Sequence, residues 1–259
     1  MINYIRTKIK NQKIRLQEWR EAYLFKKYSR KALIPFDENW FKGKRVAIIG
    51  GADSAYKEKL GEYIDSFDVV VRINNGVRVI DKYHEYVGKR TDFLFHSFYT
   101  EEDEGKSPIE VDLWRNKNVK NLIFSYSIEF LDYGRKYSNN FMKVTKGKYN
   151  YSCVNYKQTL ENRELVYPTN PTTGIIAINT IMACHPKLIY ITGITFFRTP
   201  HLSDYRDVGL HIWRENVKSG KSAHNFDIEY KAFKKLYCQH TAIFKLDTTL
   251  QQIIDNDHE

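Results

Sequence analysis

The chain has 259 residues, of which 42% are apolar and 15% aromatic, and its formal net charge is +10. This length fits one large domain or a domain with an appendage, and the apolar content supplies a full core, which excludes a largely disordered chain. No uninterrupted apolar stretch approaches the roughly 18–20 residues of a transmembrane helix, and the N-terminus lacks a signal-peptide pattern, so we expect a soluble, cytoplasmic protein.

Residues 1–35 form a basic segment that carries +8 of the net charge and leaves +2 for the rest of the chain. Apolar side chains recur in it at helical spacing: Ile5, Ile9, Leu16, Trp19 and Tyr23. The pattern predicts a basic amphipathic helix, which either lies on the anionic surface of an inner membrane or packs on the domain. The nearly neutral remainder argues against a nucleic acid partner.

Residues 36–259 are expected to form a single α/β domain. Apolar runs predict strands at Val46–Ile49, Asp68–Ile73, Thr91–His96, Asn121–Ser127 and Lys187–Thr192, and helix-compatible stretches cover Ala55–Ile64, Gly174–Ala183 and Phe226–Tyr237. This alternation predicts a mainly parallel, Rossmann-like nucleotide-binding sheet with helices on both faces. The acidic stretch Tyr99–Asp112 and residues 197–223 are expected to be loops, the second of them near a site.

The first predicted strand ends in Gly50 and Gly51, before small and polar residues. Such a turn can bring backbone N–H groups close to phosphate oxygens, or it can be a simple turn. It is not a P-loop, because no Gly-Lys-Ser/Thr follows, and it is an incomplete version of the dinucleotide fingerprint.

Two further polar segments stand where a ligand could bind. Asn74 follows the second predicted strand, and ligands of open α/β sheets bind beyond the carboxyl ends of strands. Its amide either contacts a phosphate or nucleotide, or closes the strand in an Asx turn. Thr172, Thr173 and Gly174 open an apolar helix; the threonines either cap its first N–H groups or hold a carboxylate or ribose. Arg72, inside the second strand, is expected to pair with a carboxylate.

His211 and His224 are the candidate catalytic histidines, because imidazole can take a proton from a hydroxyl group at neutral pH. His96 and His185 are interpreted as structural, and His201, His240 and His258 as exposed. Glu229, five residues after His224, is expected to fix the first turn of the helix there. The three cysteines have no metal-ligand spacing and are expected to be reduced thiols, and no metal site is expected.

These segments, taken together, resemble the four motifs of the sialyltransferases of glycosyltransferase family 29. Ile64–Asn74 is similar to the long motif, and Pro171–Gly174 through Ile191–Thr195, including Cys184, to the short motif. His211-Ile-Trp213 resembles the third motif, and His224 with Glu229 the very short one. The bacterial sialyltransferases of family 42 share this layout more loosely.

The resemblance implies a sialyltransferase variant of the GT-A fold, a CMP-activated sugar as donor, and no metal or other cofactor. It assigns His224 as the base on the acceptor hydroxyl and His211 as a contact of the leaving phosphate. Asn74 would hold the nucleotide phosphate, and Thr172, Thr173 and Gly174 the donor.

Two departures from the family pattern stand out. The family has an asparagine where this chain has Gly51, so that one donor contact is either missing or supplied by Ser54. No cysteine lies near Val46, so the disulfide that secreted-pathway members make to the counterpart of Cys184 cannot form here.

The sequence therefore predicts a metal-independent, inverting transferase that moves sialic acid from CMP-sialic acid to a glycan or glycolipid acceptor, such as a surface polysaccharide or lipooligosaccharide precursor. A Kdo transferase that uses CMP-Kdo is the first alternative. A dinucleotide-dependent oxidoreductase and a non-catalytic basic adaptor at the membrane surface are more remote ones.

Overall fold

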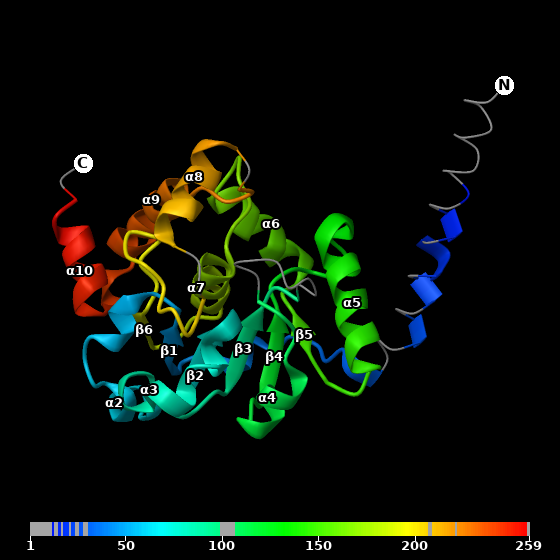
Figure 1. Ribbon diagram of the computed structural model, residues 1–259, viewed down its shortest axis with the longest axis horizontal. Helices are drawn as coiled ribbons and strands as arrows, with labels where there is room; N and C mark the ends of the chain where they lie inside the picture. Colours follow the sequence, from blue (N-terminus) through cyan, green and yellow to red (C-terminus); the bar gives the residue numbers. More distant parts are fainter. Residues whose placement is uncertain are drawn as a thin grey trace.

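The structure is a computed structural model that describes residues 12, 15, 16, 18–20, 22, 23, 26, 27, 31–98, 107–206, 209–220 and 222–257. Seven parallel strands form one sheet in the order β5-β4-β3-β2-β1-β6-β7 (Figure 1). The strands are β1 (Arg45–Ile49), β2 (Val69–Ile73), β3 (Phe93–His96), β4 (Asn121–Phe124), β5 (Ser152–Cys153), β6 (Leu188–Thr192) and β7 (Phe244–Leu246).

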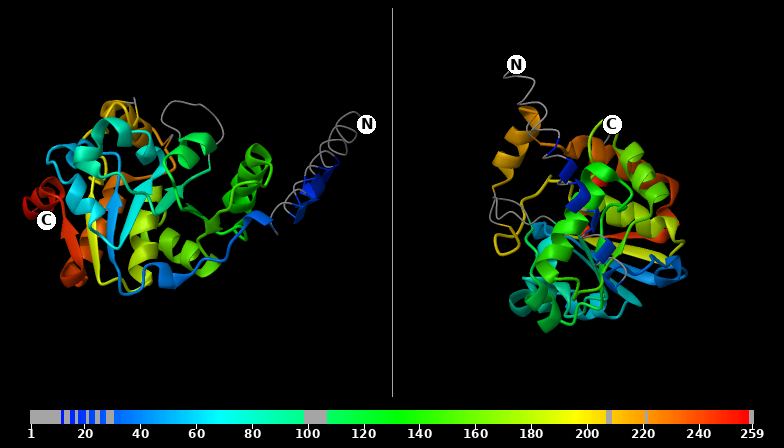
Figure 2. Two further views of the ribbon diagram at one scale, coloured as in Figure 1. Left: turned by 90° about the horizontal axis from the view of Figure 1, so that it is seen from below. Right: turned by 90° about the vertical axis from the view of Figure 1, so that its right-hand side faces the viewer.

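Helices connect the strands. The α-helices of the domain are α2 (Gly61–Asp65), α3 (Ile80–Val87), α4 (Val111–Asn116), α5 (Lys136–Thr145), α6 (Tyr156–Leu165), α7 (Thr173–Ala183), α8 (Leu210–Lys218), α9 (Phe226–Gln239) and α10 (Thr248–Asp255). Short turns of other helical types are η1 (Glu38–Trp40), η2 (Asp53–Tyr56), η3 (Asn74–Val77), η4 (Leu131–Arg135) and η5 (Thr241–Ile243). Figure 2 shows α10 and α5 at opposite ends of the domain, as the sheet order requires.

The central strands are buried on both faces, which explains their continuous apolar sequence. In β1, Val46 and Ile48 face a core shared with α7, α9 and α10, whereas Ala47 and Ile49 face a second core with the α2–α3 region. A third core lies between the β3–β4 end of the sheet and the α4 and α5 side, around Trp114. This arrangement confirms the predicted parallel α/β sheet with helices on both faces.

The strand order reverses at β1. The chain runs outward from β1 through β2 to β5, crosses over, and then adds β6 and β7 on the other side of β1. The carboxyl ends of β1 and β6 thus flank the point where the order switches, which is where parallel sheets of this kind bind ligands.

All five predicted strands are present, within three residues at each end. The predicted helix Ala55–Ile64 is wrong in part, because the segment divides into η2 and α2. A Cβ atom at Gly61 would stand 2.1 Å from the carbonyl oxygen of His84, so α2 begins at a backbone contact with α3. The expected loop 197–223 contains a nine-residue helix, α8.

Among the described residues no carboxylate pairs with Arg72, contrary to expectation. Its fully buried guanidinium donates to the carbonyl oxygens of Val87 and Gly88 at 2.8 Å each, and its Nε also donates to Thr91 Oγ1 at 3.0 Å. The side chain therefore fastens the end of α3 to the sheet, and burial lowers its pKa to about 10.

The predicted amphipathic helix lies largely outside the described residues. Three of its predicted apolar positions are described, and their exposed fractions are 70% for Leu16, 68% for Trp19 and 53% for Tyr23. The basic segment is joined to the domain further on, where the backbone of Ala32 and Ile34 hydrogen-bonds to that of Tyr151. In the part of the chain that the structure describes, no helix is long and apolar enough to cross a bilayer.

Candidate functional site

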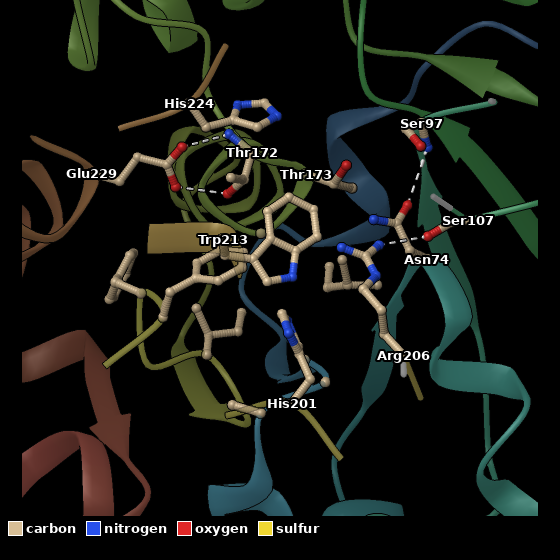
Figure 3. Close-up of a pocket in the computed structure, with 18 of the residues that line it drawn as sticks. Asn74, Ser97, Ser107, Thr172, Thr173, His201, Arg206, Trp213, His224 and Glu229 are labelled. Atoms are coloured by element: carbon tan, nitrogen blue, oxygen red, sulfur yellow. Dashed lines mark hydrogen bonds between the residues drawn. The ribbon is translucent and has the colours of Figure 1, made fainter. Parts of the chain in front are cut away.

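A cavity of about 510 Å³ opens at the carboxyl ends of the central strands (Figure 3). Its wall includes the residues that follow β1, β2, β3 and β6, together with the start of α7. Seven of the nine predicted site residues line it: Gly50, Gly51, Asn74, Thr172, Thr173, Gly174 and His224. A volume of this size accommodates a small organic ligand.

Gly50 and Gly51 line the cavity and are also needed for packing within the protein. A Cβ atom at Gly50 would stand 2.2 Å from the carbonyl oxygen of Gly193, and one at Gly51 would stand 2.2 Å from the ring of Tyr205. The Tyr205 hydroxyl in turn donates to the carbonyl oxygen of Ile73 at 2.9 Å. These two glycines therefore allow the turns after β1 and β6 and the Tyr205 ring to meet closely.

Ser54 does not line the cavity. Its hydroxyl donates at 2.8 Å to Asp247 Oδ2, which also accepts from Thr192 Oγ1 and from the backbone N–H of Gly193, both at 3.0 Å. Asp247 thus joins η2, the carboxyl end of β6 and the start of α10. In this structure Ser54 has a structural hydrogen bond, and its predicted donor contact stays a prediction.

Asn74 has the geometry of a ligand-binding amide. It adopts a left-handed conformation, with φ of 47°, directly after β2. Its Oδ1 accepts from the backbone N–H of Ser97 at 3.2 Å, so the amide connects the ends of β2 and β3. This bond fixes the orientation of the amide and leaves the Nδ2 donors facing the cavity (Figure 3).

Thr172 precedes α7 without capping it by its side chain. Its backbone N–H and its hydroxyl donate instead to the two carboxyl oxygens of Glu229, each at 2.7 Å. Glu229 is buried, and this burial raises its pKa to about 8 against the opposing effect of the two Thr172 hydrogen bonds. Glu229, expected to fix its own helix start, thus fixes the start of α7.

The first turn of α7 presents backbone donors to the cavity. The first N–H groups of an α-helix have no partner within the helix, and the helix dipole makes this end positive. Thr173 and Gly174 supply such groups and both line the cavity. This end of α7 therefore suits an anionic ligand.

His224 faces the cavity in the form that a general base requires. Its Nδ1 lies 2.7 Å from the carbonyl oxygen of Asn170, which can only accept, so Nδ1 carries the proton. Nε2 then has a lone pair and no hydrogen-bond partner among the described residues. Burial lowers the pKa of His224, partly offset by the Asn170 hydrogen bond, and the charge of Arg206 lowers it further. The ring is thus neutral near pH 7.

The other candidate histidine, His211, lies outside the cavity. Its side chain is exposed on the first turn of α8, whereas the following Ile212 and Trp213 line the cavity. Its role as a contact of the leaving phosphate therefore stays a prediction. His201, expected to be exposed, lines the cavity instead and stacks on Tyr205, with ring centroids 5.6 Å apart.

Sequence reasoning missed several residues of the cavity wall. Tyr126 and Tyr133 stack with ring centroids 5.8 Å apart, and Tyr137 continues the row 6.0 Å from Tyr133. Arg206 also lines the cavity, and its guanidinium donates to Ser107 Oγ at 2.9 Å. The tyrosines follow β4 at steps of seven and four residues, which indicates a helical face but no ligand site, and Arg206 lies in a segment without periodicity.

The cysteines Cys153, Cys184 and Cys238 are free. Across the described ranges, no three His, Cys, Asp or Glu side chains come together in a group that could hold a metal ion.

Comparison with curated proteins gives matches to sialyltransferases and a shorter match to a thioredoxin reductase. A curated type 2 lactosamine alpha-2,3-sialyltransferase of Homo sapiens is 27% identical over 186 residues, which cover 59% of this chain and 50% of that protein. A curated thioredoxin reductase of Borreliella burgdorferi is 32% identical over 113 residues, but these cover only 41% of this chain and 34% of that protein. The chain thus spans between a third and a half of the length of these two relatives.

Solved sialyltransferases share the fold. The crystal structure of a mammalian sialyltransferase matches with a TM-score of 0.54 and 14% identity, over 87% of this chain and 78% of that one. The sialyltransferase CstII of Campylobacter jejuni, in complex with cytidine-5'-monophosphate, matches with a TM-score of 0.52 and 16% identity, over 80% of each chain.

The sequence model of glycosyltransferase family 29 (sialyltransferase) matches residues 7–241, which is most of the chain and includes the whole cavity wall. The chain therefore belongs to glycosyltransferase family 29, the sialyltransferases.

Proposed function

We propose that this protein transfers sialic acid from CMP-sialic acid to the hydroxyl group of a glycan acceptor, with inversion at the anomeric carbon and without a metal ion. The proposal rests mainly on the geometry of His224. Its Nδ1–H donates to the carbonyl oxygen of Asn170, and its free Nε2 faces a cavity at the switch point of the sheet. Family membership and the CMP bound in a solved neighbour of the same fold support the choice of donor.

In the proposed reaction, the bond between the anomeric carbon and the phosphate oxygen breaks, and its electron pair leaves with CMP. The acceptor oxygen attacks the same carbon from the opposite face and forms the new glycosidic bond. The acceptor's proton passes to Nε2 of His224, which can take it because that nitrogen carries the lone pair. The negative charge that collects on the phosphate is stabilised by oriented donors, for which Asn74 and the first turn of α7 are available.

The start of α9 fixes the position of His224 relative to the backbone donors at the start of α7. Through His224 and Glu229, the start of α9 holds both Asn170 and Thr172, the residues immediately before α7. Two hydrogen-bonded anchors within one short segment restrict movement of the base relative to the α7 N-terminus. Such fixed placement is how an enzyme lowers the entropic cost of bringing reacting groups together.

We further propose that residues 1–35 bring the enzyme to an anionic membrane surface that carries a glycolipid or polysaccharide precursor. The three exposed apolar side chains Leu16, Trp19 and Tyr23 support this attachment, and so does the +8 charge of the segment.

The proposal is tested by incubating the full chain with CMP-sialic acid or CMP-Kdo, with and without a galactose-terminated acceptor and with EDTA present. Release of CMP from CMP-sialic acid, with transfer that EDTA does not reduce, is the expected result. Turnover of CMP-Kdo alone would replace sialic acid by Kdo as the donor sugar, and dependence on a metal ion would contradict the metal-independent mechanism.

A dinucleotide-dependent oxidoreductase is not favoured. A dinucleotide fold needs a long helix after the first strand, whose N-terminus holds the pyrophosphate. Here β1 is followed by the four-residue turn η2, and the ring of Tyr205 stands over Gly51.

A further inference from the structure

Arg206 has the character of a ligand-binding cation. It is the single Lys or Arg among the described residues that line the cavity. No carboxylate lies within ion-pair distance of it among the described residues, and its guanidinium is held by the neutral hydroxyl of Ser107. Arg206 is half-buried, with its Nε fully buried. A cation withdrawn from water in this way, with no anionic partner among the described residues, is costly, and a bound anion would offset that cost.

Two buried donors beside the cavity lack an acceptor among the described residues. They are Nε of Arg206 and Nε1 of Trp213. The guanidinium lies over the Trp213 ring, 5.5 Å from its centroid, so the two donors belong to neighbouring groups. Buried N–H groups are nearly always paired in native proteins, and an unpaired pair of donors in a cavity wall indicates a ligand with acceptor oxygens.

The surroundings of Arg206 point its charge into the cavity. Figure 3 shows the guanidinium beside the Asn74 amide and pointing toward Ser107, with Thr173 across the cavity. The positive charge of Arg206 also acts on other residues of the cavity wall, because it lowers the pKa of both His201 and His224. Ser107 is itself buried, so the hydrogen bond to it orients the arginine fork rather than exposing it to solvent.

We infer that Arg206 binds an oxyanion of the CMP-sugar donor, with the Asn74 amide as a second donor to the same group. This inference rests on the proposed function, which supplies a donor with two oxyanions: the phosphate and the carboxylate at the anomeric carbon. Arg206 provides a fixed positive charge, which the neutral His224 does not, and a planar fork that matches either anion.

The contact can be assigned to one oxyanion by measuring the affinity of the full chain for cytidine, for CMP and for an inert 3-fluoro analogue of CMP-sialic acid. The variant Arg206→Gln removes the charge. Losing a hydrogen bond to a charged group weakens binding by about 10- to 100-fold. A loss for CMP with cytidine unchanged places the phosphate on Arg206, whereas a loss for the analogue with CMP unchanged places the carboxylate there.

The control is Arg198→Gln, because Arg198 lies outside the cavity wall, over the Tyr230 ring and 3.6 Å from Asp227. It should bind all three probes as the wild type does. If Arg206→Gln fails to fold, Arg206→Lys and Ser107→Ala replace it; the first keeps the charge without the fork, and the second removes the hydroxyl that orients the fork. A several-fold loss for CMP or the analogue is expected from each.

Unchanged affinity for all three probes in every Arg206 and Ser107 variant that folds would overturn the inference and leave the proposed function standing. Failure of the wild type to bind either CMP or the analogue would instead contradict the proposed function, and this inference with it.

Discussion

At the scale of single residues, the site depends on two titratable groups that burial shifts in opposite directions. Burial disfavours the charged form of each, so the pKa of His224 is lowered and that of Glu229 is raised to about 8. The same segment before α7 accepts from one and donates to the other. Both groups are thus neutral near pH 7, one as a base and the other as an anchor.

The lowered pKa of His224 predicts the acid limb of the rate profile. Transfer requires the unprotonated ring, so kcat/KM should rise with pH through the pKa of His224, and the midpoint of this rise should lie below the ordinary value of 6.5. The measurement is kcat/KM for a CMP-sugar across pH 4.5–9. A midpoint of the acid limb above 6.5 would show that another group, or a charged environment, governs the base.

Glu229 predicts a dependence of stability on pH. Its folded pKa of about 8 lies above the ordinary value of 4.5, so the folded state binds the proton more tightly than the unfolded chain. Its stabilising effect is therefore complete below pH 4.5 and is lost as pH rises through 8, with a slope of at most about 1.4 kcal/mol per pH unit. Glu229→Gln should flatten this slope in urea unfolding at pH 5–9. An unchanged slope would show that the carboxyl ionises normally.

Site residues could be predicted from the sequence where they lie in a motif or at the end of a predicted element. Asn74 follows a predicted strand, and His224 and the segment Thr172–Gly174 stand at the starts of predicted helices; all of these residues reach the cavity. Arg206 and His201 could not be found in this way, because a loop of irregular shape brings them to the wall. The donor contact of Ser54 and the phosphate contact of His211 were assigned from motif resemblance, which does not specify where a side chain points.

At the scale of elements, one aspartate joins the turn η2, which follows β1, to the carboxyl end of β6. Asp247 accepts from Ser54, Thr192 and Gly193, and also caps α10 through the backbone N–H of Leu250 at 2.7 Å. Because Asp247 is buried, its removal would leave several donors unpaired.

We therefore expect Asp247→Ala to lower the free energy of unfolding by about 3 kcal/mol or more, from the loss of a cap and of buried hydrogen bonds. Urea denaturation followed by circular dichroism measures this change. The matched variant Asp255→Ala, at the exposed end of the same helix, should change stability by at most about 0.5 kcal/mol. Equal effects of the two substitutions would contradict the role of Asp247.

Strong apolar runs predicted the long central strands, and the short edge strands escaped prediction for a physical reason. β5 has two residues and β7 has three, too few to show any periodicity. Helix α8 was missed because it has only nine residues, and its apolar ones, such as Ile212, Trp213 and Val217, lie within a longer polar and aromatic segment. Its position is set by contacts such as that of Trp213 with Phe197, whose ring centroids lie 5.5 Å apart.

At the scale of the whole molecule, the sheet order could not be deduced from the sequence. Alternating strands and helices predict a parallel sheet, but the return of the chain from β5 to the far side of β1 depends on which long-range surfaces match. That return creates the switch point and thus the cavity. The family resemblance supplied the site's location, which local patterns alone left open.

The basic N-terminal segment predicts attachment to anionic membranes. A chain that lacks residues 1–30 keeps Ala32 and Ile34, whose backbone pairs with Tyr151, so it should fold and bind CMP normally. Flotation with vesicles that contain phosphatidylglycerol should recover the full chain and leave the truncated chain unbound, and high salt should weaken the recovery. Equal recovery of both chains would assign lipid binding elsewhere.

The most direct test of the proposed function compares His224→Ala with the wild type in two measurements, CMP affinity and the rate of sialic acid transfer. Loss of a general base lowers the rate by about 10²- to 10⁴-fold, whereas the affinity for CMP should change little, because Asn74 and the α7 N-terminus remain. Transfer at the wild-type rate in His224→Ala would contradict the assignment of the base.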